Sequence, residues 1–525
     1  MKPFFPRLVV ASFLSCLLAI SARAAEPAAV FSDHMVLQRG TEVPVWGTTE
    51  ANAEVTVSFA GNSVSGKADA NGDWRLMLPA MAASTENRVM TVSGGGKDKK
   101  IQNVLVGDVW VGSGQSNMAG KAASYAPRDP TLAALVEKAP YPQIRLANGG
   151  PKPSWKEATA ETIPQFSALL FAFGERLHQD LDVPIGLIVG AVGGTPSGAW
   201  MPAEIFETSE ACQAEIAEFA KTWDREKALK QHEAKVAAWE KMAEKAKAAG
   251  EKVRGRKPLP PADPGESSRG RKTGGLFDQY IRSVSGYAIR GVLWDQGEAG
   301  SGIVGLGQYT SMTELIRGWR ELWGQGEFPF LFVQKPSGLG NAFSKEDPIT
   351  REANAYTPVL PDIAKAGNGD ERFLYTRLMR DIPNAWMVPA IDLGAMIHPL
   401  NKWGYGNRAA QVAEQRVYEM PEVQAYGPIY DSHAIDGNRV TVTFREGGEG
   451  LTVREGEPVQ GFALAGEDGQ WHWAEAEISG ENSVILTSEA VSSPKQVRFA
   501  WAKDRTWANL FNQAGLPALA FSIEE

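Results

Sequence analysis

The chain has 525 residues, which is too long for one ordinary hydrophobic core, so we expect about two to four domains. Its formal net charge of −9 argues against a nucleic-acid partner or an anionic membrane surface. Sixteen tryptophans are many; most are expected in cores and domain interfaces, although aromatic faces also suit sugar rings.

Residues 1–24 have the pattern of a secretory signal peptide. Lys2 and Arg7 form a short basic region, the apolar run VVASFLSCLLAIS follows, and a small-x-small cleavage site ends at Ala24. The apolar run is shorter than the roughly 20 residues that span a bilayer, so no stable membrane insertion is expected. We therefore expect export to the periplasm or the extracellular space.

The two cysteines indicate whether the exported chain could carry a lipid or a disulfide. Cys16 lies in the apolar run, and the preceding residues FLS match a lipoprotein cleavage box poorly, so a lipoprotein is the alternative to a free secreted form. After cleavage only Cys212 remains, and one cysteine cannot form an internal disulfide.

Both ends of the mature chain have β patterns. Residues 25–103 hold short alternating runs separated by turn clusters, which predicts a β-sandwich module. Residues 425–525 return to short alternating runs, with 439–444 as the cleanest, which predicts a C-terminal β module.

Residues 104–424 alternate between strand and helix patterns. The buried-strand runs are separated by stretches with helical spacing, such as 166–178, which predicts βαβ units and a parallel sheet. The strand runs lie at 104–111, 183–190, 291–294 and 330–333. An insertion at about 203–262 is rich in Ala, Glu and Lys over 214–249, which predicts a long solvated helix or a helical hairpin. A role at a partner surface or at the rim of the site stays open for it.

The first of these strand runs ends in GSGQSNM at residues 112–118. Glycines there permit a tight turn, and a serine at this point lies at the carboxyl edge of the sheet, where open α/β sheets place their sites. A glycine–serine loop with a helix N-cap is the alternative interpretation of Ser116.

Five blocks in chain order carry a resemblance to a known family. They are VGDVWVGSGQSNM (106–118), AVGGTPSGAW (191–200), WDQGEAGSG (294–302), FPFLFVQKP (328–336) and IDLGAMIHPLNKWGYGNR (391–408). Together they resemble the sialate O-acetylesterase family of the SGNH class of esterases and lipases. The resemblance implies an α/β SGNH-hydrolase-like sheet flanked by helices. It also implies a serine esterase that removes O-acetyl groups from sialic acid or from acetylated oligo- and polysaccharides.

Ester hydrolysis needs a nucleophile, a base and donors for the oxyanion. The resemblance assigns Ser116 as the nucleophile and His398, in a loop after the apolar run 386–391, as the base. It implies three oxyanion donors: the backbone N–H groups of Ser116 and of Gly194 (or Gly193), and the side-chain amide of Gln296. No metal or cofactor is required, and the oligomeric state is not indicated.

The third member of a triad is missing from its usual place. The family usually carries an Asp two or three residues before the histidine, and this chain has Met396 and Ala395 there. Glu298, Asp392 or a backbone carbonyl are the candidates to orient the imidazole, and the two carboxylates are alternatively substrate contacts. The missing Asp leaves a second hypothesis, a catalytically degenerate carbohydrate-binding or scaffold protein.

Overall fold

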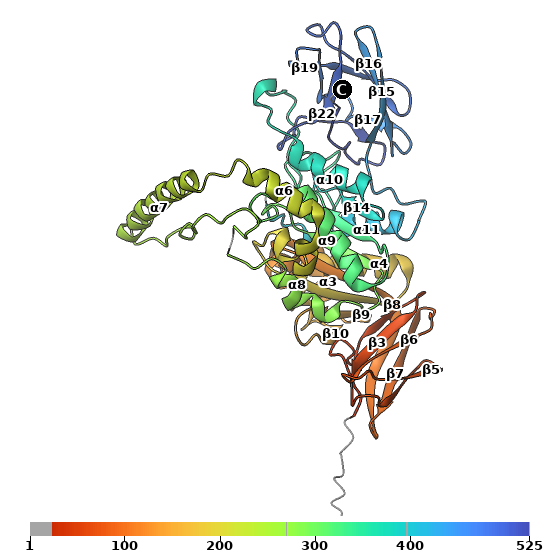
Figure 1. Ribbon diagram of the computed structural model, residues 1–525. Coiled ribbons are helices and arrows are strands. Elements are labelled where there is room, and N and C mark those ends of the chain that lie inside the picture. Colours follow the sequence, from red (N-terminus) through yellow and green to blue (C-terminus); the bar gives the residue numbers. More distant parts are fainter. Residues whose placement is uncertain (1–23, 269, 395–396, 524–525) are drawn as a thin grey trace, which may run out of the picture.

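The computed structural model describes residues 24–268, 270–394 and 397–523. Figure 1 shows a β module near the N-terminus, a central α/β body, and a β module at the C-terminal end. Of the predicted leader, all but Ala24 lies outside the described residues. Within the described ranges, no helix is both long enough and apolar enough to cross a membrane.

The strand β8 (Lys97–Gly114) runs through two of these parts. Its first half pairs antiparallel with β7 (Ser84–Gly94), and its second half pairs parallel with β11 (Ile185–Ala191) and β12 (Gly291–Asp295). The second half carries the apolar run VLVGDVWV and is buried throughout. The predicted boundary between residues 103 and 104 therefore falls inside one strand, and the N-terminal strands share a continuous hydrophobic core with the α/β body.

The N-terminal strands form two sheets. One contains β1, β3 and β6, and the other contains β2, β4, β5 and β7 with the first half of β8. Their bounds are β1 (Glu26–Pro27), β2 (Val36–Gln38), β3 (Val43–Thr48), β4 (Glu54–Phe59), β5 (Asn62–Lys67) and β6 (Asp73–Leu78). The ring of Phe31 lies 5.4 Å from that of Tyr287 in the α/β body, so aromatic packing joins the two parts.

The central sheet has the strand order β10-β9-β11-β8-β12-β13-β14. All neighbouring pairs from β9 to β14 are parallel, and β10 adds an antiparallel edge. The remaining bounds are β9 (Tyr141–Asn148), β10 (Trp155–Ala158), β13 (Phe330–Val333) and β14 (Ala385–Val388). The predicted parallel α/β sheet is confirmed, and the carboxyl ends of β8, β11, β12, β13 and β14 meet at one edge.

Two helices brace this sheet beside the site. The helices α4 (Ala168–Leu181) and α11 (Lys402–Arg416) pack against each other, α4 contacts β9 and β11, and α11 contacts β13 and β14. The helical pattern at 166–178 is confirmed by α4. The other helices of the body are α1 (Ser116–Ala119), α2 (Ala122–Tyr125), α3 (Pro130–Glu137), α8 (Gly275–Tyr280), α9 (Gln308–Trp323) and α10 (Asp370–Asp381).

The insertion forms an arm. It contains α5 (Ala203–Thr208), α6 (Glu210–Ala220) and α7 (Arg225–Ala248), and Figure 1 shows α7 projecting away from the body. The helix is interrupted between α6 and α7. The Asp224 side chain caps α7 by accepting a hydrogen bond from the N–H of Lys227. The predicted segment 214–249 is thus two helices, and the second is almost entirely exposed.

The C-terminal module has its own core and two four-stranded sheets. One sheet contains β15 (Ile429–Asp436), β16 (Arg439–Arg445), β21 (Ser483–Thr487) and β20 (Glu475–Ile478). The other contains β19 (Trp471–Trp473), β18 (Phe462–Ala465), β22 (Gln496–Phe499) and β24 (Phe521–Ile523), while β17 (Leu451–Thr452) pairs with β23 (Phe511–Asn512).

The buried guanidinium of Arg372, on α10, ties this module to the body. It donates to the carbonyl oxygens of Pro336 and Gly338, which follow β13, and to that of Lys503 in the C-terminal module. Because these three carbonyls share one guanidinium, a loop of the C-terminal module is fixed beside the carboxyl edge of the central sheet.

Close packing of α11 on α4 depends on Gly406. A Cβ added there would lie 2.7 Å from the Cβ of Ala172 and from two backbone atoms of α4. We expect Gly406→Ala to lower the free energy of unfolding by about 1–3 kcal/mol, because the helices must separate. Urea unfolding measures this change, with Gly466→Ala as the control because its nearest neighbour would lie 3.5 Å away. An equally stable Gly406→Ala protein would contradict this account of the packing.

Candidate active site

Ser116 is the first residue of α1 and lies two residues beyond the end of β8. Gly114 has φ +125°, and a side chain there would collide with the carbonyl oxygen of Asp295 at the end of β12. The N–H of Gln115 donates to that same carbonyl over 2.8 Å. The turn that carries the serine is therefore fixed to the neighbouring strand, and it requires glycine at position 114.

His398 lies in the loop between β14 and α11. Its Nε2 is 2.7 Å from the Oγ of Ser116, although the two residues are 282 positions apart in the sequence. The imidazole is exposed to solvent. The structure thus brings together the two residues to which the sequence assigns nucleophile and base, at hydrogen-bond distance.

The two carboxylates considered as the acid of a triad each have other partners in the structure. Asp392 is fully buried and accepts two hydrogen bonds from Arg408, at 3.1 and 2.9 Å. Glu298 accepts a hydrogen bond from Gln115 and pairs with Lys335 at 3.0 Å. Each carboxylate is held by a neighbouring cation, so neither is free to turn toward the imidazole.

The positions where the family usually carries its Asp, 395 and 396, lie outside the described residues. In the part of the chain that the structure describes, Ser116 is the hydrogen-bond partner of the His398 ring, and no carboxylate contacts it. The arrangement is therefore a Ser–His pair.

Backbone N–H groups face the nucleophile from the next loop. A Cβ on Gly193 would lie 3.5 Å from the Cβ of Ser116, so this glycine borders the serine directly. Gly194 has φ +70° and open space where a side chain would stand. Within the described residues, the N–H groups of Ser116, Gly193 and Gly194 donate no hydrogen bond, so they are available to a developing oxyanion.

Gln296, the third expected oxyanion donor, has its side-chain amide hydrogen-bonded within the protein. Its amide is fully buried, and Nε2 donates to the carbonyl oxygens of Thr195 and Gly300, each over 3.2 Å. Both amide hydrogens are therefore used. Gln296 thereby braces the loop that carries Gly194.

Two buried lysines flank the nucleophile, and the sequence did not single them out. Lys335, after β13, lies 2.6 Å from Asp295 and 3.0 Å from Glu298. Burial alone would lower the pKa of this lysine, but the two carboxylates outweigh it and raise the pKa above its usual value. Glu298 in turn holds Gln115, which precedes Ser116.

Lys402 has a different environment. Its Nζ donates to the Oδ1 of Asn117 over 2.6 Å and lies over the rings of Tyr125 and Tyr405, at 4.7 and 5.2 Å. Burial lowers the pKa of Lys402 to about 7. The only sequence signal for it is a lysine between the catalytic loop and a helix, in HPLNK.

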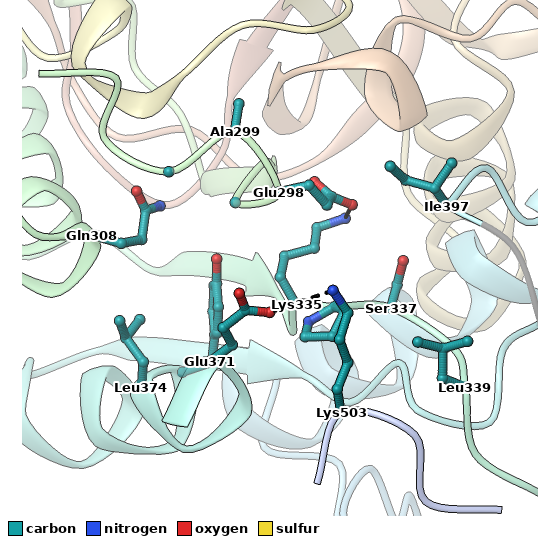
Figure 2. Close-up of a pocket in the computed structure, with 14 residues that line it drawn as sticks. Glu298, Ala299, Gln308, Lys335, Ser337, Leu339, Glu371, Leu374, Ile397 and Lys503 are labelled. Carbon is teal, nitrogen blue, oxygen red and sulfur yellow. Dashed lines mark ion pairs between the residues drawn. The ribbon is translucent and has the colours of Figure 1, made fainter. Parts of the chain in front are cut away.

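A pocket of about 570 Å³ opens beside the Ser–His pair. Figure 2 shows its lining, in which Glu298 borders Lys335. Ile397, the residue before His398 in the sequence, also lines the pocket. Apolar side chains form part of its wall, and Glu371 faces Lys503 of the C-terminal module across 3.9 Å. Its other lining residues include Gln308, Ser337, Leu339, Leu374 and Tyr375.

The site has a serine hydroxyl hydrogen-bonded to an imidazole, and free backbone N–H groups lie beside it at the edge of a parallel sheet. This is the arrangement of a serine ester hydrolase. The comparisons with known proteins confirm this enzyme class and the resemblance that the five sequence blocks carry. Residues 106–250 match the family described as carbohydrate esterase, sialic acid-specific acetylesterase.

The relatives cover most of the chain. The sialate O-acetylesterase of Rattus norvegicus is 24% identical over 93% of this chain and 91% of its own length. The human sialate O-acetylesterase is 24% identical over 77% of this chain and 73% of its own. The crystal structure of a carbohydrate acetylesterase from Xanthomonas citri is 28% identical and covers 95% of this chain and 99% of its own, with a TM-score of 0.70. The likeness thus includes the β modules as well as the α/β body.

The buried Lys402 makes stability depend on pH. Asp295, Glu298 and Asp129 favour its charged form, whereas burial and Lys335 oppose it. The pKa is about 7 in the folded chain and has its ordinary value of 10.5 in the unfolded chain, so between these values the unfolded chain binds a proton that the folded chain has lost. The stability contributed by this group is therefore complete above the higher value and lost as the pH falls through about 7.

We expect the melting temperature of the wild type, minus that of Lys402→Met, to increase as the pH rises from about 6 to about 9. Thermal unfolding followed by circular dichroism across this range measures the difference. Lys495→Met removes an exposed lysine and should show no such trend. A difference between wild type and Lys402→Met that stays constant with pH would contradict the lowered pKa.

Proposed function

We propose that the protein is an exported carbohydrate O-acetylesterase that uses Ser116 and His398 through an acetyl-serine intermediate. The observation that carries the proposal is the 2.7 Å contact between His398 Nε2 and Ser116 Oγ beside free backbone N–H groups. The signal-peptide pattern of residues 1–24 supports the export.

In the first half of the reaction, His398 Nε2 takes the proton of Ser116 Oγ, and Oγ attacks the acetyl carbonyl carbon. The carbonyl oxygen gains negative charge and accepts hydrogen bonds from the N–H groups of Ser116 and Gly194. The tetrahedral intermediate then collapses. The bond to the sugar oxygen breaks, and His398 returns the proton to that oxygen.

In the second half, a water molecule replaces the sugar hydroxyl. His398 takes a proton from the water as it attacks the acetyl-serine, and the same N–H groups hold the second oxyanion. The bond between Oγ and the acetyl carbon then breaks, His398 returns the proton to Oγ, and acetic acid leaves with Ser116 restored. Because the imidazole is exposed, water reaches it without a conformational change.

The pocket's charges bear on which saccharide is bound. Lys335 is already neutralised by two carboxylates, and Lys503 faces Glu371. A sugar carboxylate placed here would meet Glu298 and Glu371, whereas neutral hydroxyl groups can donate to them. This pocket therefore favours a neutral acetylated saccharide over sialic acid.

A carbohydrate-binding or scaffold protein is the alternative that the missing acid supports. The short contact between Ser116 and His398 counts against it, because a degenerate site has no need to keep a serine in register with an imidazole.

The proposal predicts that Ser116→Ala lowers acetate release from 4-nitrophenyl acetate by about 10³-fold or more, because the covalent intermediate cannot form. Acetate release by the wild type is then compared between O-acetylated sialic acid and acetylated xylan or xyloglucan oligosaccharides. Unchanged hydrolysis by Ser116→Ala would reject the nucleophile. A folded wild type that releases no acetate from any of these substrates would favour the binding-protein alternative.

If the pocket binds the saccharide, Lys503→Gln should affect saccharide binding without affecting the hydrolysis of a small ester. For a neutral oligosaccharide, KM should change by about two- to fivefold, because a rim contact is lost, while hydrolysis of 4-nitrophenyl acetate stays unchanged. Lys495→Gln, an exposed change on the same module, serves as the control. A loss of about tenfold or more that is confined to O-acetylated sialic acid would show instead that Lys503 binds a carboxylate.

A further inference from the structure

The loop that carries His398 needs an anchor that the ring itself does not supply. In a complete triad, a carboxylate holds the imidazole in place and fixes its tautomer. Here the ring is exposed, and its partner within the described residues is Ser116 itself. The neighbouring Ile397 is 60% exposed while Pro399 is buried, so side-chain packing holds the loop only on the far side of His398.

Asn117 supplies a direct link between nucleophile and base. This residue follows Ser116 and is fully buried, and its Nδ2 donates to the carbonyl oxygen of Ile397 over 3.2 Å. One hydrogen bond therefore joins the residue after the nucleophile to the residue before the base. Its length constrains how far the His398 loop can move away from Ser116.

Lys402 determines which way the Asn117 amide points. Its Nζ donates to Oδ1 over 2.6 Å and Nδ2 donates to the carbonyl oxygen of Ile397, so the amide oxygen faces the lysine and the amide nitrogen faces the loop.

The position of Lys402 is energetically unfavourable for a positive charge. It is fully buried at the first position of α11, where the helix dipole disfavours a positive charge. Within the described ranges, no carboxylate lies within ion-pair distance of its Nζ. Costly buried charges of this kind concentrate at functional sites, and its lowered pKa reports the same cost.

We infer that Asn117 and Lys402 are positioning residues, which hold the His398 loop against Ser116 and replace the anchoring that a triad carboxylate gives. The inference rests on the proposed esterase function. It assigns the two residues no contact with the substrate, since they act through the backbone of Ile397.

Asn117→Asp tests this role, because it removes the donor to Ile397 and keeps an acceptor for Lys402. We expect kcat for 4-nitrophenyl acetate to fall by about 10- to 100-fold with KM within about twofold, since the base is misplaced while binding persists. In a His398→Ala background, the same change should alter the residual rate by less than about twofold, because there is no imidazole left to position. Asn438→Asp, an exposed change in a remote turn, is the matched control.

A fall by the same factor with and without His398 would overturn the inference, because Asn117 would then act on Ser116 or on the fold. Lys402→Met is the second variant, should Asn117→Asp fail to fold, and it should show the same dependence on His398 with a smaller loss.

Hydrogen–deuterium exchange gives a readout that does not need activity. We expect amides of residues 397–402 to exchange faster in Asn117→Asp, while those of α4 keep their wild-type rates. Unchanged exchange in 397–402 would overturn the inference. If the wild type releases no acetate, the proposed function fails, and the exchange measurement alone decides whether Asn117 holds the loop.

Discussion

The active-site geometry depends on the different partners that two buried lysines find on either side of one serine. Lys335 has two carboxylates, and one of these, Glu298, holds the side chain of Gln115. Lys402 has an amide and two aromatic rings, and that amide belongs to Asn117. Both neighbours of Ser116 are thus held through a buried lysine, Gln115 by way of Glu298 and Asn117 directly, and the opposite pKa shifts of the two lysines follow from their different partners. Such buried groups resist displacement, because breaking one contact leaves a charge without a partner.

The N-terminal strands and the C-terminal module both contribute to the position of this serine and its pocket. The strand β8 carries Ser116 at its end and also pairs with the N-terminal strands, so the nucleophile lies on an element fixed at both ends. The C-terminal module reaches the same edge of the sheet, because Arg372 holds the backbone of Lys503 together with two carbonyls of the pocket loop. The pocket is therefore lined by residues of two modules.

The sequence predicted the parallel sheet because buried strands leave uninterrupted apolar runs, and it placed Ser116 and His398 at strand ends that the fold brings together. It could not show which partners occupy a side chain. Gln296 has the right chemistry for an oxyanion donor, but the carbonyls that consume its hydrogens come from residues 195 and 300 and are visible only in three dimensions. Asp392 likewise lies near His398 in the sequence and is taken by Arg408, sixteen residues further on. Periodicity records burial, and it does not record hydrogen-bond partners.

In the proposed mechanism, a Ser–His pair without a carboxylate has to meet two separate requirements, and separate features of the structure serve them. The ring must stay near Ser116, which the hydrogen bond from Asn117 to the loop backbone achieves. The proton must be on Nδ1 so that Nε2 can accept from the serine, and exposure of the ring allows water to accept from Nδ1. Water stabilises the imidazolium less than a fixed carboxylate does, so more of the catalytic work falls on the oxyanion donors. The conformation of the loop at residues 193–194, which Gln296 braces, is then as important to the reaction as the histidine.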